Sequence, residues 1–157
     1  MPIKVKATLN LKGIPKEIKK EFLKTRADKK EVEAAIVEEM IHGRSPVKGK
    51  QWKEYSPGYA KQKRGSKSAT KPVDMVLSGD MVKSLTLTKH SDGEVSINFA
   101  GEAIKARYHD FPKANSNMPQ RRLLPRAAGE EFKRSIQKVI NEMLIRAATR
   151  VILAANR

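Results

Sequence analysis

The stretch LTLTKHSDGEVSINF, residues 85–99, decides the fold class of this chain. Its two halves, residues 85–89 and 95–99, alternate apolar and polar side chains, as strands with one buried face do. Asp92 and Gly93 lie between them, and an Asp-Gly turn flanked by alternating runs strongly favours a β-hairpin. We therefore predict two antiparallel strands joined by this turn.

Upstream of the hairpin, residues 3–11 also alternate with period two, which predicts a half-buried strand that ends at Gly13. Pro15 follows, and proline is well tolerated in the first turn of a helix, where its missing N–H is not needed. We expect this first helix to end near residue 27.

A second helix is predicted directly after the first. Asp28 and Glu31 have the spacing of a capping box, in which the first side chain accepts from an orphan N–H group and the second bonds back. Gly43 is a natural residue to follow the C-terminus of this helix, because glycine adopts positive φ without strain. The apolar residues of one face are Val32, Ala35, Ile36, Met40 and Ile41.

The longest amphipathic pattern follows Pro125, which we expect to begin the last helix, with Glu130 and Glu131 in its early turns. Arg146 and Arg150 fall near its C-terminus, so the order of charges suits the helix macrodipole. The apolar stripe favours core or subunit contact over a cofactor site. It consists of Phe132, Ile136, Val139, Ile140, Met143, Ala147 and Val151.

Shorter elements complete the prediction. Ser56 and Pro57 favour a short helix to about residue 64, residues 77–85 favour one or two helical turns, and residues 103–111 fit either a helix or more sheet. The fold class is α+β: a small, mostly antiparallel sheet with a β-hairpin, packed by a long C-terminal helix and N-terminal helices. We expect residues 1–157 to form a single domain.

The composition limits the chemistry. The chain has no cysteine, which excludes disulfides and thiolate catalysis, and its 157 residues are enough for a core without a metal. Residues 1–4 lack the pattern of a signal peptide, and no apolar run approaches the length of a membrane span. We therefore expect a soluble protein that is made and retained in the cytoplasm.

A large basic excess is the main clue to partners. The chain carries 33 Lys and Arg against 17 Asp and Glu, a net charge of +16. Such a charge favours nucleic acid, an acidic protein surface or an anionic membrane as partner, and it is also compatible with a solvated basic face that has no dedicated partner.

The basic excess is concentrated in a long loop segment at residues 43–73, where we find two possible roles. Its cations can neutralise phosphates while its aromatic residues stack on bases, or the aromatic residues can anchor the loop to the core. The candidate contacts to DNA or a partner are Arg44, Lys48, Lys50, Lys53, Lys61, Lys63, Arg64, Lys67 and Lys71. The candidate anchors are Trp52, Tyr55 and Tyr59. Arg121 and Arg122 form a second, smaller basic site that can pair with a partner.

Motifs for catalysis are largely missing. None of the three histidines belongs to an HExxH sequence, and no Walker A, GxSxG or GxGxxG element occurs. His109 and Asp110 are the best candidates for a general base, although we favour the simpler interpretation of a loop imidazole paired with a carboxylate. A metal-dependent nuclease using Asp74 or Asp110 remains a third hypothesis. We expect no catalytic residues, no cofactor and no metal.

Four motifs, in this order, resemble the tail-completion and neck proteins of tailed bacteriophages, the phage virion morphogenesis family. The first is the helix end at residues 38–43 with the Ser-Pro and Trp-x-x-Tyr segment at 44–59. The others are Leu77-Ser-Gly-Asp-Met-Val-Lys-Ser-Leu85, Tyr108-His-Asp-Phe111 and Met118-Pro-Gln-Arg121. The resemblance covers about residues 30–145 and rests on the order and spacing of the motifs.

The resemblance implies a structural virion protein without enzyme activity. It implies a homo-oligomeric ring, commonly sixfold, that completes the tail or joins it to the head connector, with DNA passing through the lumen. Its expected neighbours are the connector or head-completion proteins and the tail-tube proteins, and no membrane contact is expected. The expected location is the virion neck or tail, after synthesis in the host cytoplasm. The alternative function is a general, sequence-nonspecific nucleic-acid-binding protein.

Overall fold

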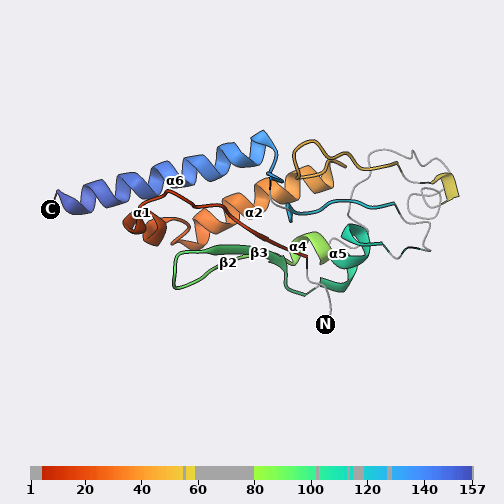
Figure 1. Ribbon diagram of the computed structural model, residues 1–157, viewed down its shortest axis with the longest axis horizontal. Helices are drawn as coiled ribbons and strands as arrows, with labels where there is room; N and C mark the ends of the chain where they lie inside the picture. The colour runs from red at the N-terminus through yellow and green to blue at the C-terminus, as the bar shows by residue number, and fades with distance from the viewer. Residues whose placement is uncertain are drawn as a thin grey trace.

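The chain forms an α+β fold in which a three-stranded antiparallel sheet packs against helices (Figure 1). This computed structural model describes residues 5–54, 56–58, 80–101, 103–112, 114, 119–126 and 129–156. The strands are β1 (Lys6–Thr8), β2 (Leu85–Lys89) and β3 (Val95–Phe99). The helices are α1 (Lys16–Glu21), α2 (Arg26–Ile41), α4 (Asp80–Lys83), α5 (Ala103–Asp110) and α6 (Arg134–Ala155). The predicted fold class, with its hairpin and long C-terminal helix, is confirmed.

The sheet has the strand order β1-β3-β2, with β3 paired antiparallel to both neighbours. The hairpin forms where it was predicted, and Gly93 in its turn has φ +84, a conformation that other residues rarely adopt. The first strand is shorter than predicted, because only Lys6–Thr8 are in the strand. Its alternation nevertheless continues, since Leu9 and Leu11 are both buried.

Helix α2 lies between the sheet and α6, and it contacts both (Figure 1). Its buried face carries Val32, Ile36 and Met40, which belong to one apolar cluster with residues from the sheet and from α6. On the sheet side, the backbone N–H of Leu87 donates to the buried carboxylate of Glu33 over 3.0 Å. The core of the fold is thus built around this helix.

The start of α2 differs from the prediction. Thr25 is the N-cap, and its hydroxyl accepts from the N–H of Asp28 over 3.0 Å, so the capping motif begins three residues earlier than expected. The first helix also ends sooner than predicted. Leu23, which is fully buried, has φ +49, and this value is incompatible with a continuing α-helix. The side chain of Asp28 is then free to pair with Arg150.

The end of α2 is as predicted. Gly43 has φ +72, and its N–H donates to the carbonyl of Met40 over 3.1 Å. The N–H of Arg44 donates to the carbonyl of Glu39 over 2.8 Å. These two bonds form a Schellman motif, which satisfies carbonyls that the helix end leaves unpaired.

Helix α6 begins at Arg134 and not at Pro125, so the prediction that Glu130 and Glu131 lie in its first turns is wrong. The reason is a contact with a distant part of the chain. The N–H of Lys48 donates to the carbonyl of Glu131, and the N–H of Lys133 donates to the carbonyl of Pro46, each over 2.8 Å. A backbone held in this way is extended, and the helix can start only after it.

The stripe predicted for α6 faces the core: Ile136, Met143 and Ala147 are buried. The two arginines lie before the last turn of α6, which contains no basic residue, so they stand outside the turn in which the macrodipole acts. Arg146 pairs with Glu31 over 2.8 Å and Arg150 pairs with Asp28 over 2.7 Å, so both link α6 to the first turns of α2.

The remaining elements are short. Residues 103–110 form the helix α5, which decides between helix and sheet for that stretch. Within the described part of the 56–64 stretch, Pro57 and Gly58 are helical, and residues 59–64 lie outside the described residues. None of the helices that the structure describes is long and apolar enough to cross a membrane.

Candidate functional site

Loop 44–54, the described first part of the basic segment, docks against residues 119–126 of the same chain. The carbonyl of Arg122 accepts two hydrogen bonds from this loop: one from the hydroxyl of Ser45 over 2.9 Å and one from the indole Nε1 of Trp52 over 3.0 Å. Ser45 is buried and Trp52 is half-buried against the core. The loop is therefore fastened to its own fold at this carbonyl.

A second set of contacts extends this docking toward α6. Val47 and Phe132 form an antiparallel bridge, and both side chains are buried. Nearby, the Nζ of Lys48 pairs with the carboxylate of Glu131 over 2.9 Å on the surface. The loop and the residues before α6 thus share both backbone and side-chain contacts.

On the other side of residues 119–126 lies the C-terminal end of α5. The N–H of Leu123 donates to Oδ1 of Asp110 over 3.0 Å, and the N–H of Arg121 donates to the carbonyl of His109 over 2.8 Å. The amide of Gln120 donates to the carbonyl of Asp110 over 2.8 Å. Segment 119–126 is held between α5 and loop 44–54, and we call this set of contacts the Arg122 node.

Asp110 is a fully buried carboxylate within the node. Its Oδ2 lies 2.9 Å from the Nε of Arg126, whose guanidinium also stacks 3.4 Å above the ring of Phe111. Burial raises the pKa of Asp110 to about 6, although the hydrogen bond from Leu123 and the charge of Arg122 act to lower it. The ion pair with Arg126 favours the charged form as well, so Asp110 at neutral pH is an ionised structural link.

Glu39 forms a similar link between α2, loop 44–54 and the start of α6. Its carboxylate accepts from the Nε of Arg44 over 2.8 Å, the hydroxyl of Ser135 over 3.0 Å and the Nζ of Lys133 over 3.2 Å. Burial acts to raise the pKa of Glu39, but these three donors outweigh it, and the pKa is lowered. The residue is 7% exposed and its carboxylate is hydrogen-bonded by these donors, so its role is also structural.

Three of the predicted contact residues that the structure describes are ion-paired within the fold. Arg44 pairs with Glu39, Lys48 with Glu131, and Arg122 with Glu130 over 3.1 Å. Arg121 is only 4% exposed, so its guanidinium is not presented at the surface as predicted. Lys50 and Lys53 are exposed. The other predicted residues lie outside the described part of the chain: Tyr55, Tyr59, Lys61, Lys63, Arg64, Lys67 and Lys71.

The two carboxylates predicted as candidates for catalysis or metal binding differ in what the structure describes. The carboxylate of Asp110, predicted as part of a general base or metal site, is engaged by Leu123 and Arg126 and is not exposed. Asp74 lies outside the described residues. Among the residues that the structure describes, no group of three or more His, Asp or Glu side chains is placed to hold a metal ion.

Sequence reasoning missed the structural roles of Glu39, Asp110 and Arg126. Each is a charged residue in or beside a helical pattern, and charged residues at such positions are ordinarily solvated. Each also has at least one partner that is not its neighbour in the sequence. The sole available signal was position: Asp110 follows a helical stretch, and Arg126 follows Pro125.

Three of the four motifs that carry the family resemblance meet at the Arg122 node. The segment with Ser45 and Trp52, the Tyr-His-Asp-Phe segment and the described end of the Met-Pro-Gln-Arg segment are joined there by hydrogen bonds. In the remaining motif, residues 77–85, the side chains of Met81, Val82 and Leu85 are buried in the core. Searches found no family model, no curated protein and no solved structure that matches the chain.

Proposed function

We propose that this chain is a structural protein of the neck or tail end of a tailed bacteriophage, which assembles as a homo-oligomeric ring around the path of the DNA. It acts by assembly and not as an enzyme. The observation that carries the proposal is the meeting of three resemblance motifs at the Arg122 node. Motifs that are spread over the sequence but joined in space are expected of residues that maintain one family-specific scaffold.

Exposed apolar side chains support an assembly role. Ile145, Ile152 and Leu153 are 66%, 60% and 59% exposed, and their spacing places them on one side of the C-terminal part of α6. Figure 1 shows this end of α6 projecting beyond α1. Large apolar side chains exposed on one side of a helix are suited to protein–protein contacts.

Electron microscopy of phage particles made without the protein tests the proposal. We expect such particles to show separated heads and tails, or tails with abnormal ends. Infectivity should be restored when the wild-type chain is supplied in trans. Intact, infectious virions formed in its absence would reject the role.

A second function is favoured by the charge alone. With a net charge of +16 and exposed lysines such as Lys50 and Lys53, the chain is suited to sequence-nonspecific binding of nucleic acid. This reading predicts salt-sensitive binding by the isolated monomer. Ring formation without such binding would favour the structural role.

A further inference from the structure

Helix α1 presents lysines to solvent. Its inward face is marked by Ile18, which packs against the core, and by the fully buried Phe22 that follows the helix. Lys16 and Lys20 lie on the opposite side of the helix from Ile18, and both are exposed. Among the described residues, neither lysine has a carboxylate partner, and Glu17 is the acid of the first turn. This face of α1 therefore carries uncompensated positive charge.

The first turn of α2 adds cations where a helix least favours them. Arg26 is its first residue, and Lys29 follows at the spacing that places two side chains on one side. Positive charges at a helix N-terminus oppose the macrodipole. Asp28, the acid of this turn, is paired with Arg150 of α6. An arrangement that breaks a local rule in this way is expected where function requires it.

The β-hairpin is fastened beside α1 and contributes another cation. The Nζ of Lys89 on β2 donates to the carbonyls of Lys20 and Phe22, the latter over 2.7 Å. In the hairpin turn, a Cβ placed on Gly93 would lie only 3.1 Å from the Cβ of Lys19, so the turn packs directly on α1. Figure 1 shows α1 and this turn at the same end of the molecule. We call the cations gathered here the α1 surface: Lys16, Lys19, Lys20, Arg26, Lys29 and Lys89.

The positive charges at this end of the molecule are crowded. Burial lowers the pKa of Lys89, and the charges of Lys29, Lys24 and Arg150 lower it further, although Glu21 acts in the opposite direction. Glu21 is itself paired with Lys24 over 2.7 Å. The repulsion among these cations would be relieved by a bound polyanion.

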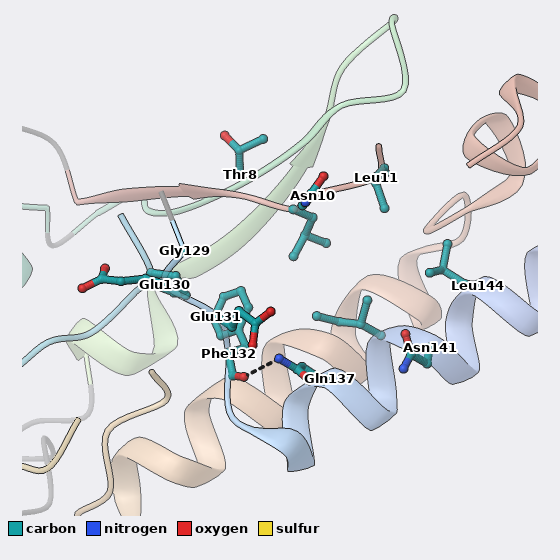
Figure 2. Close-up of a pocket in the computed structure, with 13 residues that line it drawn as sticks. Thr8, Asn10, Leu11, Gly129, Glu130, Glu131, Phe132, Gln137, Asn141 and Leu144 are labelled. Carbon is teal, nitrogen blue, oxygen red and sulfur yellow. Dashed lines mark hydrogen bonds between the residues drawn. The ribbon is translucent and has the colours of Figure 1, made fainter. Parts of the chain in front are cut away.

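The charges are balanced differently at the groove between residues 8–11 and residues 129–132 with α6 (Figure 2). The groove has a volume of about 380 Å³, and its lining includes Glu130 and Glu131. Glu130 pairs with Arg122 over 3.1 Å, and Glu131 pairs with Lys48 over 2.9 Å. These acids are already neutralised by the fold, whereas the exposed lysines of α1 are not.

The kind of side chain on the α1 surface indicates the partner. Lysine is depleted from the cores of protein–protein interfaces, which favour aromatic residues, and the α1 surface is defined by lysines and one arginine. A lysine ammonium binds phosphate as a point charge, without regard to sequence. Duplex DNA carries one negative charge per about 1.7 Å of its axis, so one segment can meet several neighbouring cations at once.

We infer that the α1 surface binds the phosphate backbone of duplex DNA without sequence preference. The inference rests on the DNA path of the proposed function and identifies a face of the subunit that meets this DNA. It adds a second surface to the basic loop segment at residues 43–73, which the sequence alone suggested.

A double variant, Lys16→Ala with Lys20→Ala, tests this surface in the full chain. Fluorescence anisotropy with a labelled duplex of random sequence measures the slope of log affinity against log salt. We expect the double variant to make the slope shallower by roughly 2, because two phosphate contacts are lost. Lys83→Ala with Lys138→Ala is the matched control, since it removes the same charge from two helical lysines outside the surface, and it should leave the slope nearly unchanged.

A second double variant separates loss of binding from loss of folding. Arg26→Gln with Lys29→Gln removes cations that oppose the macrodipole of α2, so the midpoint of thermal unfolding should be unchanged or higher. The salt slope should again become shallower by roughly 2. Weaker binding by a variant at least as stable as the wild type cannot result from unfolding. This variant decides the matter if circular dichroism shows that the α1 variant is not folded.

Several outcomes would overturn the inference. One is a wild-type chain that does not bind the duplex, and another is a salt slope that neither double variant changes, because the DNA then lies on a different surface. Vesicles containing phosphatidylserine and poly-glutamate are the competing probes. If the variants lose binding to one of these and keep binding to DNA, the partner is a membrane or an acidic protein instead. The neck role is read separately, from the morphology of particles made without the protein.

Discussion

At the scale of single residues, one backbone oxygen, the carbonyl of Arg122, holds loop 44–54 at two points. It accepts from Ser45 and from Trp52, and both donors come from a loop with no regular secondary structure to hold it. Loss of either donor leaves the loop with one fewer fixed point. The indole is the more informative of the two to change, since phenylalanine keeps much of its apolar surface.

Trp52→Phe is expected to lower the free energy of unfolding by about 1 kcal/mol, the usual value of one such hydrogen bond. Urea denaturation followed by circular dichroism measures it, since the variant has no tryptophan. Tyr108→Phe, at a residue 45% exposed, is the control and should change stability by less than about 0.5 kcal/mol. Equal stability of Trp52→Phe and the wild type would show that the loop is not anchored by the indole.

Glu39 gives a prediction for the dependence of stability on pH. Its pKa is lowered in the fold from 4.5, so the unfolded chain binds more protons in that range, and the stabilisation by Glu39 is lost as the pH falls below about 4.5. Glu39→Gln should lower stability at neutral pH by about 2 kcal/mol and make it less dependent on pH in this range. Thermal unfolding between pH 3 and pH 7 measures both effects.

Asp110 contributes with the opposite sign. Its pKa is raised to about 6, so the folded chain binds the extra proton between the unfolded value of 3.8 and about 6, and the contribution of Asp110 to stability decreases as the pH rises through that range. The comparison of Glu39→Gln with the wild type isolates the Glu39 effect, because Asp110 is unchanged in both.

At the scale of elements, the start of α2 distinguishes the structure from the sequence-based prediction. Thr25→Ala should lower the free energy of unfolding by about 1 kcal/mol, because it removes the acceptor for the N–H of Asp28. Thr25→Ser keeps that acceptor and should be close to the wild type. Glu31→Ala, which would be equally harmful if the predicted capping box were present, loses only the exposed pair with Arg146 and should lower stability by about 0.5 kcal/mol. Urea denaturation distinguishes the two assignments.

Among the elements, the hairpin and the apolar stripe of α6 are the features that the sequence predicts well. The hairpin and the stripe of α6 depend on patterns that repeat within a few residues, and both were predicted correctly. The start of α6 depends instead on backbone bonds between residues 131–133 and residues 46–48. No local pattern contains that information, so Pro125 was a reasonable but wrong start for the helix.

The candidate site follows the same rule. An aromatic anchor in the basic loop was considered from composition, but its acceptor at Arg122 is 70 residues away. The burial of Arg121 and the pairing of Asp110 with Arg126 also require the tertiary structure. Charge patterns reveal which residues are basic and not which of them the fold has already neutralised.

At the scale of the whole molecule, the charge of +16 makes a quantitative prediction for the runner-up function. If the chain contacts roughly six phosphates, its affinity for duplex DNA falls about a thousandfold between about 50 and about 200 mM salt. Lys50→Ala should reduce the slope of log affinity against log salt by about 1 if Lys50 meets a phosphate. Fluorescence anisotropy with labelled DNA measures the slope.

Lys48→Ala is the matched control for this measurement, because it removes the same charge from a lysine that already pairs with Glu131. It should change the slope less than Lys50→Ala does. A slope near zero for the wild type would exclude phosphate contacts as the purpose of the basic surface.

The contact between Trp52 and Arg122 also bears on how the chain folds. It spans 70 residues, whereas β2 and β3 pair across a short turn. Closing a long loop costs more conformational entropy than closing a short one. The hairpin should therefore form before the loop docks. Trp52 is the only tryptophan, and its fluorescence therefore reports the docking of this loop and not the earlier pairing of β2 with β3.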